Sequence, residues 1–358
     1  MKKLALIISL VLLLLSSACS IRQDHLAVPE KDLQSNEITI DAFDTTGTIT
    51  IYGVTNSKDA DDYFYSMETL IMAYNDCFSK TDPASEIYEI NHRTTDSVLV
   101  HAETATLFGL AKDLYDWSNG KFDISAGTLI DLWDVKNRKT LPTESEIKEA
   151  MEHTHNFDYK IEKVDNPSDG KTHKITFHGD KLTKYDLGGL IKGYCSDELK
   201  RMLSTNDAIS ACIINLGGNV LVTGNLSGRI DGAFNIGIYK PFTKGEIVDK
   251  IAVKNKHVIT SGNYQRYFKI DGDDRVYHHI IDPTTGYPTN NGLDSVTIIS
   301  DNGLLGDYLS TACMLLGEED SKKLIDFASE KFNDKNIQSI FVRSDGTMSK
   351  YPANVVLK

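Results

Sequence analysis

The sequence comprises 358 residues, of which 41% are hydrophobic and 25% charged, and its formal net charge is −13 at pH 7. The length fits one large domain or two modest ones, and the ordinary globular composition argues against disordered and fibrous proteins. The excess of negative charge repels nucleic-acid phosphates and gives no long-range attraction to anionic lipid, so we expect no nucleic-acid partner.

The first twenty residues have the features of an export signal. Lys2 and Lys3 precede a mostly apolar run from Leu4 to Leu15, and small residues then lead to Cys19. An apolar run of this length is too short for a comfortable transmembrane helix and is typical of a signal peptide.

The cysteine that follows these small residues resembles the lipobox of bacterial lipoproteins, although Ser16 stands where Leu is usual. We therefore predict a lipoprotein signal peptide over residues 1–18 and a lipid on Cys19 that anchors the protein to the extracytoplasmic face of the cell membrane. The alternative is an ordinary secreted protein with an unmodified cysteine. Residues 19–37 lack periodicity and predict a tether, which leaves a folded domain over residues 38–358.

Periodic patterns predict the first elements of this domain. Alternating β-branched residues indicate strands over residues 38–43 and 48–53. A long helix is expected from Ser57 to Phe78, with Ser57 as its N-cap and acidic residues in its first turn.

Two further helices carry end signals. One runs from about Glu103 to Ser118 and precedes Gly120, a residue suited to the left-handed conformation just beyond a helix. The other begins at a capping box formed by Thr143 and Glu146.

The second half of the chain is rich in expected strands. Helices are expected near Leu304 to Leu316 and near Glu319 to Lys331. Strands grouped with strands, with helices between the groups, predict an α+β fold of mixed and antiparallel sheets with packed helices. The strand-like runs cover residues 173–179, 211–224, 233–239, 294–300 and 337–342.

Four cysteines lie in this domain, and no two of them have CxxC spacing. Each has mostly apolar neighbours, so buried free thiols are favoured over disulfides, although a disulfide is possible outside the cytoplasm. They are Cys77, Cys195, Cys212 and Cys313.

Two pairs of glycines are candidate ligand-binding turns. Gly188–Gly189 separates a strand-like segment from a helical pattern in which Lys192 occupies the first turn. A glycine turn before a helix allows a phosphate to approach backbone N–H groups, but it also occurs as simple turn chemistry. Gly217–Gly218 interrupts an apolar strand, which predicts a bulge or a close approach of another backbone or a ligand.

The segment over residues 259–288 contains two adjacent histidines. A hairpin around Asp271–Gly272 is expected to bring "TSG" and "HHIIDP" side by side. His278, His279 and Asp282 would suit zinc on a helix, but the neighbouring residues favour a strand, on which His278 and His279 point to opposite faces. One histidine facing a pocket is therefore the preferred interpretation.

Asp307 and Thr311 lie four residues apart on a predicted helix, on a face that is largely separate from its apolar residues. A carboxylate and a hydroxyl one turn apart provide hard oxygen ligands of the kind that Mg²⁺ prefers. A hydrogen bond on the helix surface is the alternative.

Eight motifs, taken together and in their order along the chain, resemble the ApbE family of FAD:protein FMN transferases. The resemblance covers roughly residues 40–320, and eight ordered motifs are far more specific than any one of them. They are "FDTTGTITIYG" (43–53), "SEIYEIN" (85–91), "GKFDISAGTLIDLW" (120–133), "YDLGGLIKGY" (185–194), "NLGGN" (215–219), "TSGNYQRYF" (260–268), "HHIIDPTTGYP" (278–288) and "GDYLSTACMLLG" (306–317).

The resemblance implies an ApbE-like, T-fold-related architecture and a reaction. FAD and Mg²⁺ would be bound, the pyrophosphate of FAD would be cleaved, and FMN would pass to a Ser or Thr hydroxyl of an acceptor flavoprotein while AMP leaves. Such a phosphoryl transfer depends on positioning and on neutralising charge. The lipobox also agrees with the resemblance, because many members of the family are membrane-anchored lipoproteins.

The motifs imply roles for individual residues. Asp307 and Thr311 resemble the Mg²⁺ ligands, together with the main-chain carbonyl of Gly189. Lys192 is expected to contact FAD. His279 is the candidate for phosphate contact or for activation of the acceptor hydroxyl.

Five more residues are expected to contact the flavin substrate. Phe122 and Asp123 belong to the "KFDIS" segment, and Ile280 and Ile281 follow the histidine pair. Phe43 occupies a position at which the family usually has Met, and its aromatic ring would cover the flavin.

Other functions stay open at this point. The same Mg²⁺ site could hydrolyse FAD to FMN and AMP with water as the acceptor. A flavin-binding lipoprotein without catalysis is disfavoured, because the pair Asp307 and Thr311 is intact. A solute-binding lipoprotein is disfavoured as well, because two similar lobes joined by crossovers are not visible.

Overall fold

A computed structural model describes residues 35–205, 208–229 and 231–353. The predicted signal peptide and Cys19 lie outside these residues. The first strand, β1 (Ser35–Ala42), begins inside the segment predicted as a tether over residues 19–37, because Ser35 already pairs with Tyr52 of the next strand.

The largest sheet has eight strands in the order β1-β2-β6-β7-β10-β15-β16-β17, and every pairing between neighbours is antiparallel. This arrangement confirms the α+β prediction with antiparallel sheets. After β1, the strands are β2 (Thr45–Tyr52), β6 (Ala211–Leu216), β7 (Asn219–Gly224), β10 (Lys256–Gly262), β15 (Leu293–Ser300), β16 (Gln338–Arg343) and β17 (Met348–Tyr351).

The prediction of one interrupted strand over residues 211–224 is wrong. Gly217 and Gly218 form the two-residue turn of a hairpin between β6 and β7, in which Leu216 pairs with Asn219. Their φ angles of 63° and 94° lie in the left-handed region, which glycine adopts without steric penalty. The pair therefore reverses the chain instead of bulging a strand.

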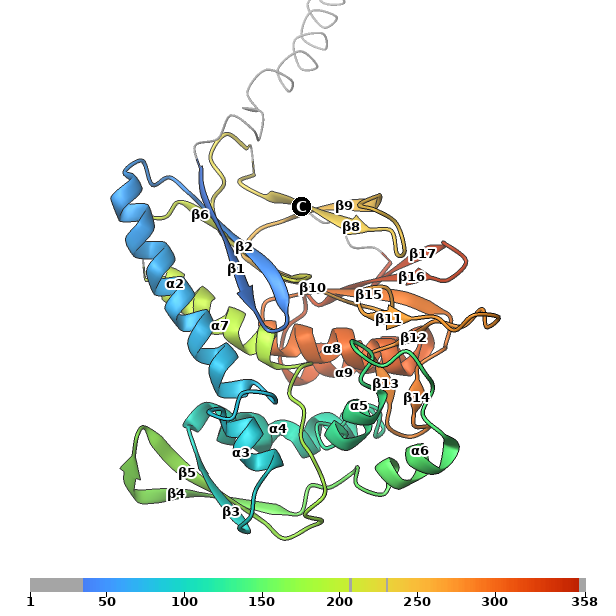
Figure 1. Cartoon of the computed structure of the whole chain (residues 1–358). Helices are drawn as coiled ribbons and strands as arrows, with labels where there is room; N and C mark the ends of the chain where they lie inside the picture. Colours follow the sequence, from blue (N-terminus) through green and yellow to red (C-terminus); the bar gives the residue numbers. More distant parts are fainter. Residues whose placement is uncertain (1–34, 206–207, 230, 354–358) are drawn as a thin grey trace, which may run out of the picture.

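Helices cover one face of the large sheet, and a separate hairpin covers the other (Figure 1). The face with helices carries α2 (Ser57–Phe78), α7 (Ile191–Leu203) and α8 (Gly303–Leu316), and α9 (Glu318–Lys331) packs on α8. On the opposite face, β8 (Phe234–Tyr239) and β9 (Ile247–Val253) bury apolar side chains against β7, β10, β15 and β16.

A second layer lies beyond the helices and contains the three-stranded sheet β3-β5-β4 (Figure 1). Two short hairpins, β11–β12 and β13–β14, pack with α5 and α6, away from this sheet (Figure 1). The elements are α3 (Glu86–Asn91), β3 (Ser97–Val100), α4 (Ala102–Trp117), α5 (Gly127–Trp133), α6 (Glu144–Met151), β4 (Tyr159–Ser168), β5 (Lys171–Phe177), β11 (Tyr267–Phe268), β12 (Tyr277–His278), β13 (Ile281–Asp282) and β14 (Tyr287–Pro288).

Most helix ends agree with the sequence signals, with two differences. The capping box of Thr143 and Glu146 is confirmed at the start of α6. The N-cap of α2 is Asn56, whose side chain accepts from the Lys58 N–H, because Ser57 is already the first helical residue. At the end of α4, Asn119 takes the first left-handed position and Gly120 the second.

The buried interior agrees with the composition. A continuous apolar core extends from β1 and α2 through α4 and α8 to β16. The four cysteines within the described residues are unpaired thiols, as the sequence favoured, and three of them are fully buried. Across the same residues, no helix combines the length and apolar character needed to cross a membrane.

Candidate active site

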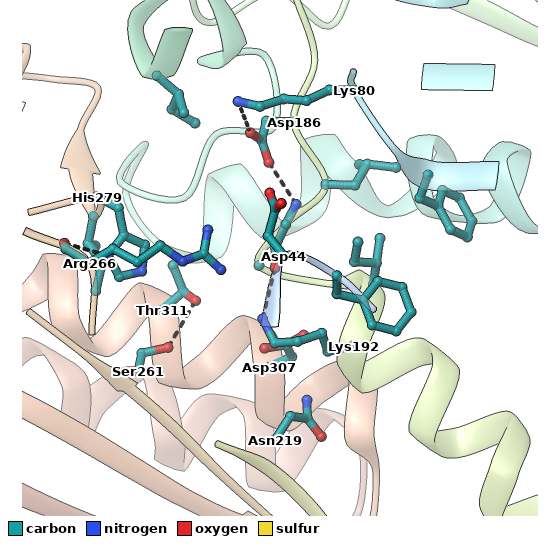
Figure 2. A pocket seen from close by; sticks show the side chains of 18 of the residues that line it. Asp44, Lys80, Asp186, Lys192, Asn219, Ser261, Arg266, His279, Asp307 and Thr311 are labelled. Atoms are coloured by element: carbon teal, nitrogen blue, oxygen red, sulfur yellow. Dashed lines mark hydrogen bonds and ion pairs between the residues drawn. The ribbon is translucent and has the colours of Figure 1, made fainter. Parts of the chain in front are cut away.

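A cavity of about 640 Å³ lies between the helices of the large sheet and the second layer. Figure 2 shows side chains from both layers pointing into it. Segments far apart along the chain meet here, which no local pattern could establish. All ten residues assigned to a site from the sequence line this cavity: Phe43, Phe122, Asp123, Gly189, Lys192, His279, Ile280, Ile281, Asp307 and Thr311.

Helix α8 places Asp307 and Thr311 on the cavity wall. The side chain of Asn302 caps the helix by accepting from the Leu305 N–H at 2.7 Å. Asp307 is buried, and its Oδ2 accepts from the Gly193 N–H at 2.9 Å, so its carboxylate caps the N-terminus of α7. The Thr311 hydroxyl lies 3.3 Å from Ser261 Oγ on β10.

Close contact between α7 and α8 sets the position of Asp307. A Cβ atom at Gly193 would lie 2.2 Å from the Gly303 carbonyl oxygen and 2.7 Å from Asp307 Cβ. Only glycine allows the two helices to approach this closely. The contact between α7 and α8 at Gly193 and Gly303 is the seam between these helices. It holds Lys192, in the first turn of α7, beside the carboxylate of Asp307.

The turn before α7 brings the backbone of Gly189 to the same place. Asp186 Oδ1 accepts from the Gly188 N–H at 2.8 Å, which fixes the turn. A Cβ atom at Gly189 would lie 3.3 Å from Thr311 Oγ1 and 2.9 Å from the Phe122 ring, so the backbone of Gly189 adjoins Thr311. A carboxylate, a hydroxyl and a carbonyl are the hard oxygen donors that suit Mg²⁺.

The electrostatics of Asp307 agree with such a site. Burial raises the pKa of the Asp307 carboxyl above its ordinary value, although Lys192 and the Gly193 N–H act in the opposite direction. A buried carboxylate favours a nearby cation, because a positive charge compensates for the lost hydration. The donor set therefore fits a divalent cation.

An ion pair that the sequence did not point to lies across the cavity. Lys80 Nζ is 2.9 Å from Asp186 Oδ2 and 3.1 Å from Asp131 Oδ1. Burial acts to raise the pKa of Asp186, but Lys80 outweighs it, and the pKa is lower than usual. Asp186 stands in the "YDLGG" motif, whereas no sequence pattern marks Lys80.

His279 faces the cavity, and His278 does not. His278 is buried, and its Nε2 is 2.8 Å from the Thr289 carbonyl oxygen. The Nδ1 of His279 is 3.3 Å from the Arg266 carbonyl oxygen, so in the neutral ring Nδ1 carries the proton and Nε2 is the free base. The two side chains thus have different surroundings, as expected.

The pKa of His279 is strongly lowered. Burial is the largest cause, and the positive charges of Arg266 and, to a smaller extent, Lys192 add to it, so the pKa falls to about 3. At neutral pH the imidazole is therefore uncharged.

Arg266 is a cavity residue that sequence reasoning did not single out. Among the described residues its guanidinium has no hydrogen bond or ion pair with another side chain, and it lines the cavity. Figure 2 shows it extending between His279 and Asp44. The residue belongs to the "TSGNYQRYF" motif. Its positive charge just before a hairpin is the feature of the sequence that could have pointed to it. An unpaired cation in a cavity suits an anionic ligand.

Phe43 reaches the cavity from a tight turn between β1 and β2. Both Phe43 and Asp44 have positive φ angles, 54° and 58°, as a two-residue hairpin of this type requires. A bulky residue rarely adopts this conformation. The Phe43 N–H donates to Asn75 Oδ1 at 2.7 Å, which helps to hold the turn.

The remaining predicted contacts form the apolar wall. Phe122 packs edge-on against Tyr308, and Ile280 and Ile281 are buried. The carboxylate of Asp123 is fully covered and is already engaged by Ser125 and by the N–H and ring of His155. A contact of Asp123 with FAD therefore stays a prediction.

A second group of possible metal ligands lies outside the cavity lining. Within the described residues, Cys77, Glu86 and His101 have ligand atoms within 4.8 Å of one another. Both oxygens of Glu86 are already used, because Oε1 accepts from His101 and Oε2 from Thr104. This group is a buried hydrogen-bond network, and the cavity holds the donor set that suits Mg²⁺.

Comparison with known proteins shows the family of this chain. The model of the ApbE family matches residues 43–333. The chain belongs to the ApbE family. It is 30% identical over 253 residues to a FAD:protein FMN transferase of Klebsiella pneumoniae (strain 342), covering 70% of this chain and 74% of that protein.

Other family members extend the likeness. A FAD:protein FMN transferase of Treponema pallidum (strain Nichols) is 32% identical over 217 residues, which is 58% of each chain. The crystal structure of the ApbE protein of Thermotoga maritima superposes with a TM-score of 0.73 at 28% identity, over 88% of this chain and 97% of that one. The flavin transferase ApbE of Vibrio cholerae shares the fold, with a TM-score of 0.71 at 24% identity, over 89% of this chain and 97% of that one.

Proposed function

We propose that this protein transfers FMN from FAD to a Ser or Thr hydroxyl of an acceptor protein and releases AMP. The observation that carries the proposal is the convergence, in one cavity, of an oxygen donor set, the cations Lys192 and Arg266, and a neutral histidine. The cavity is of a size that suits a large cofactor. The ApbE relatives that carry the name FAD:protein FMN transferase supply the reaction class.

The lining divides into parts that suit different portions of FAD. Phe43, Phe122, Ile280 and Ile281 offer apolar surface to a ring system. Lys192 and Arg266 offer positive charge to the diphosphate, and a planar guanidinium can bind two phosphate oxygens at once. The formal net charge of the chain is −13, so the rest of the surface repels anions. A diphosphate is therefore attracted to the cavity by these two cations.

Asp307, Thr311 and the carbonyl of Gly189 would hold a Mg²⁺ ion. When bound, such an ion neutralises charge on the diphosphate during transfer. The protein contributes the fixed position of these donors, because the seam between α7 and α8 and the turn at Gly188 leave little freedom.

In this proposed reaction His279 is the general base. Its Nε2 takes the proton of the acceptor hydroxyl, whose oxygen forms a bond to the phosphorus of the FMN half. The bond between this phosphorus and the bridging oxygen breaks, and AMP leaves with that oxygen. Lys192 and Arg266 stabilise the negative charge that the reaction concentrates on the phosphate oxygens.

We also propose that the mature protein is a lipoprotein of the cell membrane. The support is the charged start of the chain, its apolar run and Cys19. Cys19→Ser is expected to abolish metabolic labelling by a fatty acid and to release the protein from the membrane fraction. Labelling that persists in this variant would contradict the proposal.

One incubation tests the function. The mature protein is mixed with FAD, Mg²⁺ and a flavoprotein acceptor, and the intact mass of the acceptor is measured. A mass gain of one FMN, with release of AMP, supports the transfer. Release of FMN and AMP without labelling indicates that water is the acceptor, and FAD that binds without being cleaved indicates a flavin carrier.

A further inference from the structure

The carboxamide of Asn219 is an unsatisfied polar group on the wall of the cavity. Asn219 is 1% exposed, and it lines the cavity. Neither its Nδ2 nor its Oδ1 has a hydrogen-bond partner among the described residues. Buried polar side chains in native proteins are nearly always paired, so an exception of this kind calls for a partner that is not part of the chain.

The strand pairing places Asn219 beside the predicted metal ligands. It is the first residue of β7, and it pairs directly with Ile259 of β10. Paired residues and residues two apart share one face of a sheet, so Asn219, Ile259 and Ser261 face the same side. Ser261 contacts Thr311 on α8, and Figure 2 shows Asn219 below Ser261 and Asp307 in that view.

The fold itself gains nothing from this amide. A buried donor or acceptor without a partner costs about 1–3 kcal/mol, and Asn219 has both kinds of group. A leucine of similar size would fill the same space without that cost. The amide is therefore useful only if a ligand satisfies it.

We propose that the Asn219 carboxamide forms hydrogen bonds with hydroxyl groups of the sugar portion of FAD next to the diphosphate. This inference rests on the proposed function. A hydroxyl group accepts from an amide N–H and donates to an amide oxygen, so it satisfies either side of the carboxamide. Next to the diphosphate, FAD carries such groups on the ribose of its AMP half and on the ribityl chain of its FMN half.

The test exploits opposite effects on stability and on binding. In the Asn219→Leu variant the melting temperature without ligand is expected to stay equal or to rise, because an unpaired group is removed. The dissociation constant for FAD with Mg²⁺, measured by calorimetry, is expected to rise at least about 10-fold, because two hydrogen bonds are lost. The smaller Asn219→Ala variant gives the same loss of binding if leucine does not fit.

Ser295 provides a matched control. Its Oγ is also buried and has no partner within the described chain, but it does not line the cavity. Ser295→Ala should leave FAD binding unchanged. Separate titrations with ADP and with FMN then identify the half of FAD that Asn219 contacts, since only one of them should bind more weakly to the variant.

The outcomes are separable. If the unmodified protein does not bind FAD, the proposed function fails and the inference fails with it. If the unmodified protein binds FAD and Asn219→Leu and Asn219→Ala bind it equally well, the inference alone is overturned.

Discussion

At the scale of single residues, the cavity combines a buried acid with cations that have few partners. Asp307 is covered by the protein and receives one hydrogen bond from Gly193, whereas Arg266 extends into the cavity. Both features are unfavourable in an isolated fold and become favourable when a metal ion and a diphosphate are bound. The metal ion thus compensates the charge of Asp307, and the diphosphate compensates the charge of Arg266.

Replacement of Asp307 by Asn tests the metal assignment. The amide keeps the shape of the side chain and can still accept from Gly193, so the fold should be retained. Loss of the charged ligand should reduce the rate of transfer at least about 100-fold, measured by the intact mass of the acceptor over time. Asp320→Asn, which makes the same change at an exposed acid of α9 outside the cavity lining, is the control. Full activity of Asp307→Asn would rule out this ligand.

The role of Arg266 is open to a charge-based test. Arg266→Ala should lower kcat/KM for FAD about 10- to 100-fold, because one charge-assisted contact to the diphosphate is lost. Arg266→Lys should recover part of the activity, since it keeps the charge but not the planar fork. Steady-state kinetics at several FAD concentrations provide the measurement, and equal kinetics in all three proteins would exclude a role in binding.

The low pKa of His279 leads to a pH prediction. If His279 is the general base, transfer requires the neutral ring, and activity falls as the pH decreases through the pKa of this residue. Arg266 lowers that pKa, so its removal makes protonation easier and raises the pKa towards the ordinary value of 6.5. The acid limb of the pH–rate profile should therefore move to higher pH in Arg266→Gln. An unchanged limb would argue against His279 as the base.

At the scale of elements, the seam between α7 and α8 carries the site. Lys192 and the hydrogen bond from Gly193 belong to α7, and Asp307 and Thr311 belong to α8. The two helices touch at Gly193 and Gly303, where no side chain separates them. The relative position of a cation and of two oxygen ligands therefore depends on two glycines.

Gly193→Ala should disrupt this seam. The new Cβ would lie 2.2 Å from the Gly303 carbonyl oxygen, so the helices must move apart. We expect a loss of about 1–3 kcal/mol in the free energy of unfolding and a loss of transfer, measured by denaturant titration and by acceptor mass. Gly109→Ala in α4 is the matched control, because a Cβ there meets no atom within 4 Å and alanine favours a helix. Equal stability of both variants would contradict the role of the seam.

At the scale of the whole molecule, the cavity lies between two layers that share one apolar core, and its lining comes from both of them. Ligands that contact both layers should therefore stabilise the folded protein. FAD with Mg²⁺ at about 100 times its dissociation constant is expected to add about 2.7 kcal/mol, seen as a higher melting temperature. A chelator should remove the Mg²⁺-dependent part, and Asp307→Asn should lack that part altogether. A melting temperature that does not depend on Mg²⁺ would contradict the site.

Much of the fold and part of the site are local in origin and could be predicted. The apolar spacing of α2 and α8, the capping box at Thr143 and the alternation in β5, β8, β15 and β16 depend only on neighbours along the chain. The motif containing Asp307 and Thr311 needs only one helical turn to bring two oxygen ligands together. Turn geometry was less accessible, since Gly217–Gly218 is compatible with a bulge or with a hairpin until its partner strand is known.

The amino-acid sequence by itself determined the α+β class, most helices and strands, the family resemblance and ten residues that line one cavity. Only the tertiary structure decided which other residues these ten contact and which polar groups near them have hydrogen-bond partners. Three features depend on residues distant along the chain. Lys80 pairs with Asp186, and within the described residues the Arg266 guanidinium has no side-chain partner and the Asn219 amide has no hydrogen bond. Hydrogen-bond partners and burial are properties of packing, and a local pattern cannot show that a polar group has been left without a partner.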